Sequence, residues 1–569
     1  MSFLLYQERN WVTKETLKVP PGFLHAAAYP EIVIQTLLRR GISTQSQAEQ
    51  FLDPGKYIPT TPYALPDMET GIERILQAVK LGQRIGVWGD FDVDGQTSTA
   101  ILVSALRQIN ADVVYHIPVR GVETHGIGVE SLKIFLNKGV DVLLTCDTGT
   151  SATEGISYAQ SAGIDVIVTD HHLLPEELPP AFALINPRRL PSSHPLASLP
   201  GAGTAFKFAE ALLSAHGNDT FHTSLYDLAA LGCVADLAEL IGETRFMVQS
   251  GLHLMRTAPR PALAAMLASA EINHEQVSEA HISFNLTPRL NAIGRLADAN
   301  PMVEFLLSTD TVKIATTVNQ IEGLNLQRKT LSDQVFNGAV AMVERNRSLL
   351  DHPVLILHHP EWPGGIVGIA ASRLVEFFHR PVILLVAPPG MPARGSARSF
   401  EGFDITAAIS ANQNLLLSFG GHPMAAGLSL LPENIEQFQR AMDKTYQTMT
   451  IEQKPKADLF IDGWVNCASL TLDFVHSLDV LAPFGQGNPP LLFAEKDLQI
   501  SKATPVGKLA EHTLIDVEDL DGSTTQIIRW NSKGLPLPDG RFNLAFSVHA
   551  SNYRCEEKVQ FEWVDYALA

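Results

Sequence analysis

The stretch RIGVWGDFDVDG at residues 84–95 decides the fold of this chain. Its first half is a short apolar run typical of a buried strand, and its second half carries Asp90, Asp92 and Asp94 at alternate positions. In an extended segment, side chains at alternate positions project on the same side. We therefore expect the three carboxylates to converge on a cation at the end of this strand.

Two later apolar runs end in the same way, in TCDTG and in TDHH, and another acid follows the apolar stretch LAALGCVA. Strands alternate with amphipathic helices in this part of the chain, which predicts a buried parallel sheet. In such sheets ligands bind outside the carboxyl ends of the strands, so these groups should gather at one edge. The residues concerned are Asp147, Asp170, His171, His172 and Asp236.

Carboxylates and imidazoles without thiolates favour manganese or magnesium over a structural zinc. Five or more acids are too many for one ion, whereas two ions about 3.5–4 Å apart would use them all and would suit the hydrolysis of a phosphate ester. A single Asp after a strand is more often a turn former or a helix cap, but three clusters at successive strand ends are harder to explain as turns. An EF-hand loop shares the D-x-D-x-D spacing, but Ile101 stands where its glutamate is expected.

Periodicity divides the 569 residues into five parts and predicts an α/β protein with a C-terminal β-barrel. We expect one long connecting helix from residue 311 onward, despite Gly323, because its apolar residues recur with helical spacing. The five parts are an N-terminal helical extension (1–80), the parallel-sheet domain (81–240), a helical region with the connecting helix (241–350), a second α/β domain (351–450) and an OB-like barrel (456–569).

The composition restricts the location of the protein and the kind of surface that it presents. A net charge of −19 counts against a protein coated by nucleic acid, although a local basic groove remains compatible with it. The four cysteines lie far apart and form no CxxC pair, which suits a reducing cytosol. We see no secretory signal pattern and no apolar run of the ~18 residues that a membrane span needs, so we expect a cytoplasmic protein that does not cross a membrane.

The motifs GDFDVDG, TCDTG, TDHH and GCVADL resemble the four acidic motifs of the DHH phosphoesterase superfamily. Four later motifs are similar to those of its RecJ branch, in the right order, and the match runs from about residue 80 to residue 430. The resemblance makes residues 351–450 a DHH-associated (DHHA1) domain and residues 456–569 a RecJ-type OB domain. The later motifs are PRLNAIGR (288–295), EWPGGIVGIAASRL (361–374), GSARS (395–399) and GGHPMAAG (420–427).

The resemblance implies two metal ions, Mn²⁺ or Mg²⁺. Asp92 would hold one ion and Asp94 the other, with Asp147 bridging them. Asp90 would lie close by. His171 and Asp236 would complete the ligand shell of the second ion.

The same resemblance implies the groups that act on the phosphate. His172 would face the scissile phosphate, oriented by Asp170, and Arg289 or Arg295 would stabilise charge on the phosphoryl oxygens. An alternative for Arg295 is a surface ion pair.

The second α/β domain would hold the nucleotide strand. Ser396 and Arg398 would bind phosphate, and Gly420, Gly421 and His422 would form a tight loop where backbone approaches the strand. The alternative for these glycines is a structural turn.

One segment departs from the family pattern. The family usually has a GYG element after the strand that corresponds to DVVYHIP at residues 112–118. Here residues 120–128 follow that strand, with Ile127 in place of the tyrosine and with two additional residues. Arg120 in this segment is a candidate substrate-binding residue, with Arg398 expected to matter more. Thr148 replaces a common Asn, but the acids are intact, which argues against an inactive scaffold.

The implied function is a single-stranded-DNA-specific 5′→3′ exonuclease of DNA repair and recombination, with a helicase or a single-strand-binding protein as possible partners. The alternative is a DHH-family phosphodiesterase for short oligonucleotides or cyclic dinucleotides. A non-enzymatic replication scaffold and an inorganic pyrophosphatase fit less well, because the acids are retained and the chain is long.

The barrel is expected to add affinity for single strands through cationic contacts and base stacking, without contributing to chemistry. The alternative for each candidate is an ordinary place in the barrel core or on a solvated surface. The candidates are Lys502, Lys508, Trp530, Tyr553 and Arg554.

Overall fold

The structure of the chain is a computed structural model, and its backbone separates into two compact units. One unit is formed mainly by Pro59–Glu452, and the other combines Met1–Ile58 with most of the segment after residue 452. The residues that the structure describes are 9–23, 29–124, 126–449, 458–507, 510–551 and 557–568.

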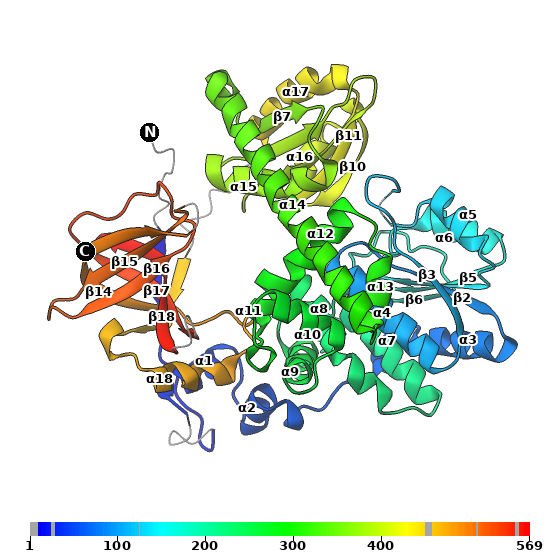
Figure 1. The fold of residues 1–569 in the computed structure, drawn as a ribbon, viewed down its shortest axis with the longest axis horizontal. Coiled ribbons are helices and arrows are strands. Elements are labelled where there is room, and N and C mark those ends of the chain that lie inside the picture. Colours follow the sequence, from blue (N-terminus) through cyan, green and yellow to red (C-terminus); the bar gives the residue numbers. More distant parts are fainter. Residues whose placement is uncertain are drawn as a thin grey trace. The chain divides into compact units, whose positions relative to one another are not determined.

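The larger unit begins with a five-stranded sheet in the order β3-β2-β4-β5-β6, in which every neighbouring pair is parallel (Figure 1). The first acidic motif follows β2, and the two later motifs follow β4 and β5, so all three leave the same edge of the sheet. The strands are β2 (Arg84–Trp88), β3 (Asp112–His116), β4 (Val142–Cys146), β5 (Asp165–Thr169) and β6 (Ala183–Ile185).

Helices cover both faces of this sheet, which explains why its strands are apolar on both sides. On one face Val87 and Leu144 belong to the largest core together with α3, α4, α7 and α8, and on the other face Trp88 and Leu143 pack with α5 and α6. The helices are α3 (Met68–Leu81), α4 (Val93–Gln108), α5 (Val129–Leu136), α6 (Thr153–Ser161), α7 (Gly201–Ala215) and α8 (Tyr226–Ala235).

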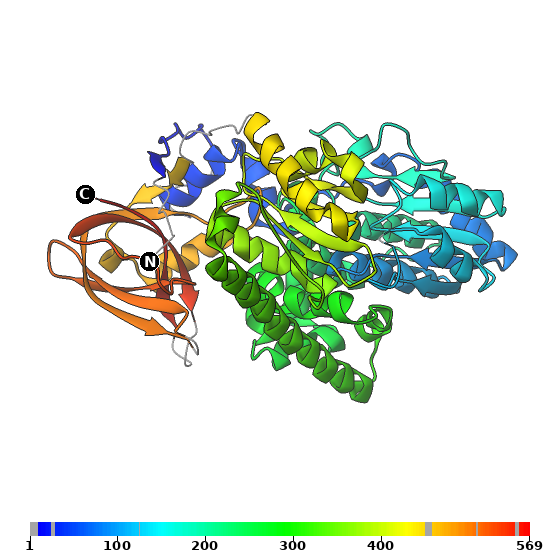
Figure 2. The same ribbon diagram turned by 90° about the horizontal axis from the view of Figure 1, so that it is seen from above.

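A helical region follows and ends in the long helix α14 (Thr311–Arg345), which Figure 2 shows in green. Its buried residues recur every three or four positions over much of the span from Ile314 to Val343, and a side chain at Gly323 would meet open space. The predicted connecting helix is therefore confirmed. The other helices of this region are α9 (Gly242–Thr257), α10 (Pro261–Ser269), α11 (Glu279–His281), α12 (Thr287–Leu296) and α13 (Pro301–Leu307).

The second sheet of the larger unit is mixed, in the order β10-β11-β9-β8-β7, with only β7 and β8 parallel. One face of this sheet packs against α14 and α15, and the other face packs against α16 and α17. The elements are β7 (Leu355–His359), α15 (Gly364–Phe378), β8 (Val382–Val386), β9 (Ala393–Arg398), α16 (Ile405–Ser410), β10 (Leu416–His422), β11 (Ala425–Leu430) and α17 (Ile435–Thr448).

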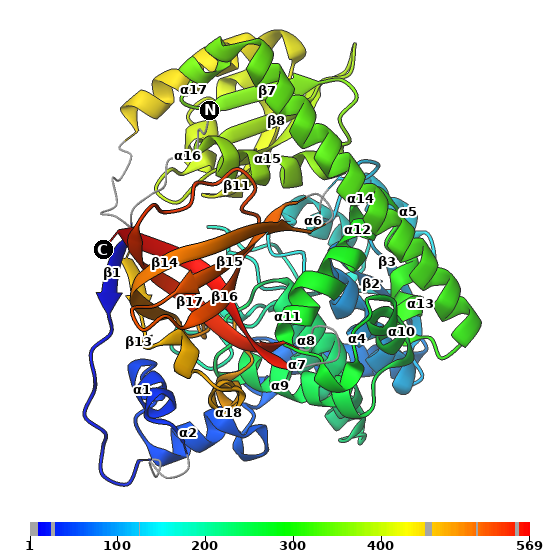
Figure 3. The ribbon, with the colours of Figure 1, turned by 60° about the vertical axis from the view of Figure 1, so that its left-hand side comes forward.

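The smaller unit contains a barrel that closes where β14 pairs with both β15 and β17 (Figure 3). This confirms the expected OB-like barrel and, with the two sheets, the α/β class. The barrel strands are β14 (Phe493–Val506), β15 (His512–Glu518), β16 (Thr524–Arg529), β17 (Arg541–Ser551) and β18 (Lys558–Leu568), and β13 (Gly463–Trp464) pairs with the beginning of β14.

The N-terminal segment belongs to this same unit. Strand β1 (Asn10–Thr13) pairs in parallel with β12 (Asp458–Ile461), and α1 (Glu31–Arg39) shares a hydrophobic core with the barrel. The extension predicted over residues 1–80 is thus divided between the two units. No helix among the described residues combines the length and apolar character required to cross a membrane.

Candidate active site

The acids and imidazoles at the edge of the first sheet form three overlapping groups, one of which is Asp147, Asp170, His171 and His172. The other two have three residues each, and together we call them the acidic centre. Within each group the possible ligand atoms lie within 4.8 Å of one another. The groups meet where Nε2 of His171 lies 3.1 Å from Oδ1 of Asp147. One group is Asp90, Asp92 and Asp147, and the other is Asp94, His171 and Asp236.

The first motif reaches these two groups by a geometry different from the extended one that we expected. Asp92 is the N-cap of α4, where its Oδ1 accepts a hydrogen bond from the amide of Gly95, and Asp94 already lies in the first helical turn. The extended interpretation was wrong because a helix that begins at Val93 rotates Asp94 away from Asp90 and Asp92. This turn is what divides one motif between the two groups.

Asp94 is fixed by the beginning of another helix. The amides of Gly201 and Ala202, in the first turn of α7, donate to its two carboxylate oxygens at 2.8 and 2.7 Å. Burial, followed by the charges of Asp236 and Asp92, nevertheless raises the pKa of Asp94 well above its usual value. The carboxylate is therefore positioned, but its charge is not neutralised by these contacts.

Asp147 connects the two groups and is the least satisfied of the acids. Its backbone is in the left-handed region, with φ of 56°, and its Oδ1 is buried and accepts no hydrogen bond from any described residue. Burial, and then Asp94, raises the pKa of this carboxyl well above its usual value. Bound cations would offset both the missing hydrogen bond and the repulsion, so the donor set fits divalent metal ions.

Asp170 orients the two histidines. Its Oδ1 accepts hydrogen bonds from the amide of His171 at 2.7 Å and from Nδ1 of His172 at 2.7 Å, and its Oδ2 accepts from the amide of Thr150. The hydrogen bond from His172 lowers the pKa of Asp170 despite burial, and it raises the pKa of His172 to about 9. Burial lowers the pKa of His171 to about 4, which leaves a neutral imidazole suited to bind a metal.

Sequence reasoning missed a residue that braces this pair of histidines. Asn186, directly after β6, is buried and donates to Oγ1 of Thr150 and to the carbonyl of His172, both at 3.0 Å. Arg188 follows and donates to the carbonyl of His171 at 2.7 Å. The only available signal was that FALINP ends a strand beside the TDHH strand, as the acidic motifs end theirs.

A second cluster consists of four arginines, Arg120, Arg295, Arg328 and Arg398, which we call the guanidinium group. Burial, then the charges of the other three arginines, lowers the pKa of Arg295 to about 10, and burial and Arg120 lower the pKa of Arg398. Within the described chain none of the four forms an ion pair with a carboxylate, and Arg328 binds only the amide oxygen of Asn325. Arg328, on α14, was not predicted from the sequence.

Glycines of the family motifs bring these elements into contact. A side chain on Gly294 of α12 would begin 2.0 Å from the carbonyl oxygen of Phe91 in the first motif, so only glycine permits this approach. A side chain on Gly368 of α15 would begin 2.8 Å from Nη2 of Arg398 and 3.3 Å from Oγ of Ser396. The guanidinium of Arg398 and the hydroxyl of Ser396 thus lie side by side over this glycine.

The other predicted phosphate arginine has a different environment. Arg289 donates to Oε1 of Glu322 at 2.7 Å and to the carbonyl of Asn285 at 2.9 Å, so its charge is already balanced. Arg295 has only a long contact of 3.4 Å with the carbonyl of Gly365. Of the two, Arg295 is the one with unused donors.

In the divergent segment, Ile127 does not take the place of a stacking tyrosine, because it is buried in the core formed by Trp88 and α5. The charged residue of the segment contacts the first motif instead. The guanidinium carbon of Arg120 lies 3.8 Å from the centroid of the Phe91 ring. The charges of Asp90 and Asp92, the two sequence neighbours of Phe91, also act on the Arg120 guanidinium, so Arg120 lies beside the acidic centre.

The structure places Gly420, Gly421 and His422 at the end of β10, not in a loop. They pair with β11 in antiparallel register, and a side chain on Gly421 would begin 2.3 Å from the carbonyl oxygen of Ala425 across the hairpin. The tight approach that we expected is therefore made to the neighbouring strand. Both glycines are exposed on an edge strand of the sheet.

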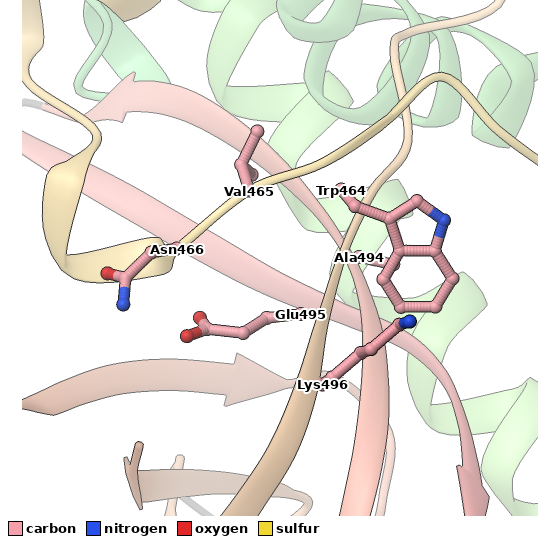
Figure 4. A pocket seen from close by; sticks show the side chains of 6 residues that line it. All are labelled: Trp464, Val465, Asn466, Ala494, Glu495 and Lys496. Carbon is pink, nitrogen blue, oxygen red and sulfur yellow. The ribbon is translucent and has the colours of Figure 1, made fainter. Parts of the chain in front are cut away.

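The smaller unit contains a hollow of about 250 Å³ that sequence reasoning missed. Figure 4 shows the side chains that line it. Nζ of Lys496 lies 5.1 Å from the ring centroid of Trp464, and Nε1 of Trp464 donates to Oγ1 of Thr13 at 2.9 Å. Its lining residues are Trp464, Val465, Asn466, Ala494, Glu495 and Lys496.

Of the barrel candidates from the sequence, Lys502 lies on the exposed part of β14, and Trp530 is half exposed and donates to Glu562 at 2.7 Å. The other three, Lys508, Tyr553 and Arg554, lie outside the described residues.

Three family models match successive parts of the chain. The DHH family N-terminal domain matches residues 84–233, the DHHA1 domain matches residues 351–448 and the RecJ OB domain matches residues 461–565. These matches follow the order of the two sheets and the barrel.

The chain is also similar to curated proteins described as single-stranded-DNA-specific exonuclease RecJ. The protein of Haemophilus influenzae is 33% identical, over 89% of this chain and 91% of its own length, and that of Escherichia coli K12 is 32% identical, over 87% and 89%. The protein of Bacillus subtilis is 30% identical, over 95% of this chain and 68% of its own length.

A crystal structure of RecJ from Thermus thermophilus in complex with Mn²⁺ superposes with a TM-score of 0.81 at 26% identity, covering 98% of this chain and 79% of that one. A second structure, of exonuclease RecJ bound to manganese, gives a TM-score of 0.60 at 29% identity, over 69% of this chain and 97% of that one. Together with the acidic motifs, the three domain matches and the relatives, these likenesses show that the chain belongs to the RecJ family.

Proposed function

We propose that this protein is an exonuclease that hydrolyses single-stranded DNA from its 5′ end with two metal ions, in DNA repair and recombination. The observation that carries the proposal is a pair of clusters of opposite charge, the acidic centre and the guanidinium group, each of which is short of counter-charges. The acidic centre repels itself without cations, and no arginine of the guanidinium group forms a salt bridge with a described carboxylate, although Arg120 and Arg295 interact with the charge of Asp92. A phosphodiester with its metal ions would complete both.

In this proposal Mn²⁺ or Mg²⁺ ions are held by the acidic centre. The two groups of three residues correspond to two ions, and Asp147 would contact both because its Oδ1 lies beside His171 of the other group. When bound, such ions polarise the phosphate and lower the pKa of water. Two solved structures of RecJ from Thermus thermophilus are complexes with Mn²⁺ and with Mg²⁺, which supports this choice of metal.

The residues of the chain then orient the phosphate and move the proton. Arg295 would donate to the phosphoryl oxygens, whose charge rises in the transition state, because its own donors are nearly unused. His172 has Nδ1 fixed on Asp170, so its Nε2 is the atom left to donate to the leaving oxygen. Asp170 would act by fixing the orientation and tautomer of His172.

The proposed polarity depends on where a terminal phosphate would bind. Arg398 and Ser396 lie together on β9, and Arg120 is close enough to lower the pKa of Arg398. A terminal phosphate carries more charge than an internal diester, so it suits a site with two guanidinium groups that form no salt bridge with a described carboxylate. A 5′-phosphorylated end held there would place the adjoining diester at the acidic centre.

Binding of single strands is proposed for the barrel, with the aromatic and cationic hollow at Trp464 and Lys496 as an additional contact. For the chain as a whole we propose a cytoplasmic location and a helicase or single-strand-binding protein as partner. We also propose that the DHH phosphoesterase, DHHA1 and OB domains occupy residues 81–240, 351–450 and 456–569.

The deciding experiment uses a long single strand labelled at each end in turn, with a 5′ phosphate or a 5′ hydroxyl, in Mn²⁺. We expect mononucleotides released in order from the 5′ end and little digestion of blunt duplex. Laddering from the 3′ end would falsify the polarity. Activity confined to oligomers of two to five residues, or to cyclic dinucleotides, would favour the alternative phosphodiesterase.

A further inference from the structure

We propose that Glu123 is a positioning residue that fixes Arg120 in the site for the terminal phosphate. The inference rests on the proposed function, because it concerns how one member of the guanidinium group is held. Glu123 itself is not expected to touch the substrate. It lies in the segment where this chain departs from the family pattern.

Glu123 closes the turn that carries Arg120. Its Oε1 accepts a hydrogen bond from the amide of Val119 at 3.0 Å, and its own amide donates to the carbonyl of Val119 at 2.9 Å. Arg120 and Glu123 also form an isolated bridge between their backbones. Glu123 therefore ties the backbone of Val119, directly before Arg120, and of Arg120 itself.

The same carboxylate attaches this turn to the rest of the domain. Its Oε2 lies 2.9 Å from Nε2 of His116, the last residue of β3, and Ser131 of α5 contributes a further side-chain hydrogen bond. Burial by itself raises the pKa of Glu123, but the hydrogen bonds from Ser131 and Val119 outweigh it, so the net pKa lies below the usual value. The group is ionised at neutral pH and can accept all of these bonds.

The His116 ring is itself held rigidly. Its centroid lies 4.7 Å from that of Trp88 in an edge arrangement and 5.7 Å from that of Phe135. The contacts of Glu123 thus lead from a packed aromatic cluster to the turn. A surface carboxylate with solvent contacts alone would not have this connection.

The consequence of this anchoring is the placement of a positive charge. Arg120 stacks on Phe91, remains exposed to solvent, and interacts with the charges of Asp90, Asp92 and Arg398. A long side chain loses conformational entropy when it is held in one geometry, so a preorganised turn reduces the cost of binding an anion. Because Ile127 is buried in the core, the segment offers this charge in place of a ring.

The test compares Glu123→Gln and Glu123→Ala with Arg120→Ala on oligonucleotides that carry a 5′ phosphate or a 5′ hydroxyl. We expect each Glu123 variant to raise KM for the phosphorylated strand, about 5-fold for Glu123→Ala and less for Glu123→Gln, as expected for a weakened charge-assisted contact. The KM for the 5′-hydroxyl strand and kcat at saturation should change by less than about twofold. Glu130→Gln, an exposed residue at the start of α5 that pairs with Lys133, is the matched control.

A double-mutant cycle separates positioning from general stability. If Glu123 acts through Arg120, the double variant Glu123→Ala/Arg120→Ala should be no worse in phosphate preference than Arg120→Ala alone. Fully multiplicative effects would overturn the inference. If Glu123→Ala does not fold, Glu123→Gln and His116→Phe, which keeps the ring but loses the hydrogen bond, replace it in the cycle.

The outcome also distinguishes this inference from the proposed function. A wild-type chain that cleaves with a 5′-phosphate preference while both Glu123 variants keep that preference would overturn the inference alone. A wild-type chain without nuclease activity in Mn²⁺ would overturn the proposed function and this inference together.

Discussion

The acidic centre and the guanidinium group are both clusters of like charges, but they are built in different ways. Three of the acidic motifs follow neighbouring strands of one parallel sheet, so topology alone brings them together. The arginines come from a loop, from α12, from α14 and from β9, and their meeting requires two α/β layers and a helical region. The acidic centre is therefore assembled mainly by the strands of one sheet, whereas the guanidinium group is assembled from elements of the whole larger unit.

This difference predicts how each cluster responds to substitution. The acidic centre is destabilised by its own charges. Replacing one acid should therefore raise the free energy of unfolding while it abolishes activity. The guanidinium group is partly solvated and its members act on different parts of the substrate. Substitutions there should separate turnover from end recognition.

The largest effect is expected for Asp147→Asn. The change removes the acid that connects the two groups, so hydrolysis should fall by more than about 10³-fold, since metal-ion stabilisation is worth several kcal/mol. Without metal, the variant should melt at a higher temperature than the wild type because one buried like charge is gone. Cleavage assays and thermal melts with and without Mn²⁺ measure both effects.

The control for this change is Asp112→Asn, an exposed acid that pairs with Arg84 at the start of β3. It should leave cleavage unchanged. An Asp147→Asn protein that is folded and still cleaves at the wild-type rate would remove Asp147 from the centre.

The next largest effect is expected for Arg295→Gln. If its guanidinium stabilises charge that develops on the phosphoryl oxygens, kcat should fall by about 10²–10³-fold. Arg289→Gln should cost less, because Arg289 is already paired with Glu322. Arg440→Gln, at an exposed pair on α17, controls for loss of a positive charge. Equal losses in Arg289→Gln and Arg295→Gln would contradict the distinction between them.

The contrast between the two clusters also explains which parts of the site could be predicted from the sequence. Acids at strand ends are visible because strand periodicity and a sharp apolar-to-acidic boundary occur together, as at Cys146 and Asp147. The sequence did not reveal that α4 begins at Val93, because an Asp-rich turn and a helix cap use the same residue types. The division of one motif between two groups therefore required the structure.

The guanidinium group was harder to find for a physical reason. Arg328 lies mid-helix among polar residues and looks like a solvated position until α12 is packed beside α14. Arg120, Arg295 and Arg398 were identified through the family resemblance, since no local pattern distinguishes an arginine without a salt bridge from one that has a salt bridge. Asn186 and the hollow at Trp464 likewise depend on contacts between segments distant in sequence.

A smaller and more selective effect is expected for Arg398→Ala. Loss of a charge-assisted contact of about 1.5–3 kcal/mol should reduce the preference for a 5′-phosphorylated end by at least about 10-fold, with kcat at saturation nearly unchanged. Competition between phosphorylated and hydroxyl-ended strands measures this preference directly. Arg398→Ala should exceed Arg120→Ala in this assay. A variant that loses turnover and keeps the preference would place Arg398 at the scissile phosphate instead.

The smallest effect is expected in the barrel, where binding and chemistry should be fully separate. Deleting residues 456–569 is a poor test, because α1 and the barrel share one hydrophobic core that the deletion would expose. Single substitutions in the hollow avoid this problem. Trp464→Ala should weaken single-strand binding about 5-fold, since one stacked base contributes about 1–3 kcal/mol, and Trp530→Ala tests the candidate from the sequence in the same way.

Lys496→Gln makes this last prediction more specific, because the binding constant of a protein that contacts phosphates depends on the salt concentration. For a single strand, the slope of log binding constant against log salt should become less steep by about 0.7 for each phosphate that the protein no longer neutralises. Phe460→Ala, a half-exposed aromatic residue on β12 with no described lysine over its ring, is the matched control for Trp464 and should change neither affinity nor slope. Turnover at saturating substrate should stay within about twofold of wild type in every one of these variants. If Trp464→Ala lowers saturated turnover by 10-fold while its melting temperature is unchanged, the barrel participates in the chemical step, and the contrast between the binding unit and the catalytic unit fails.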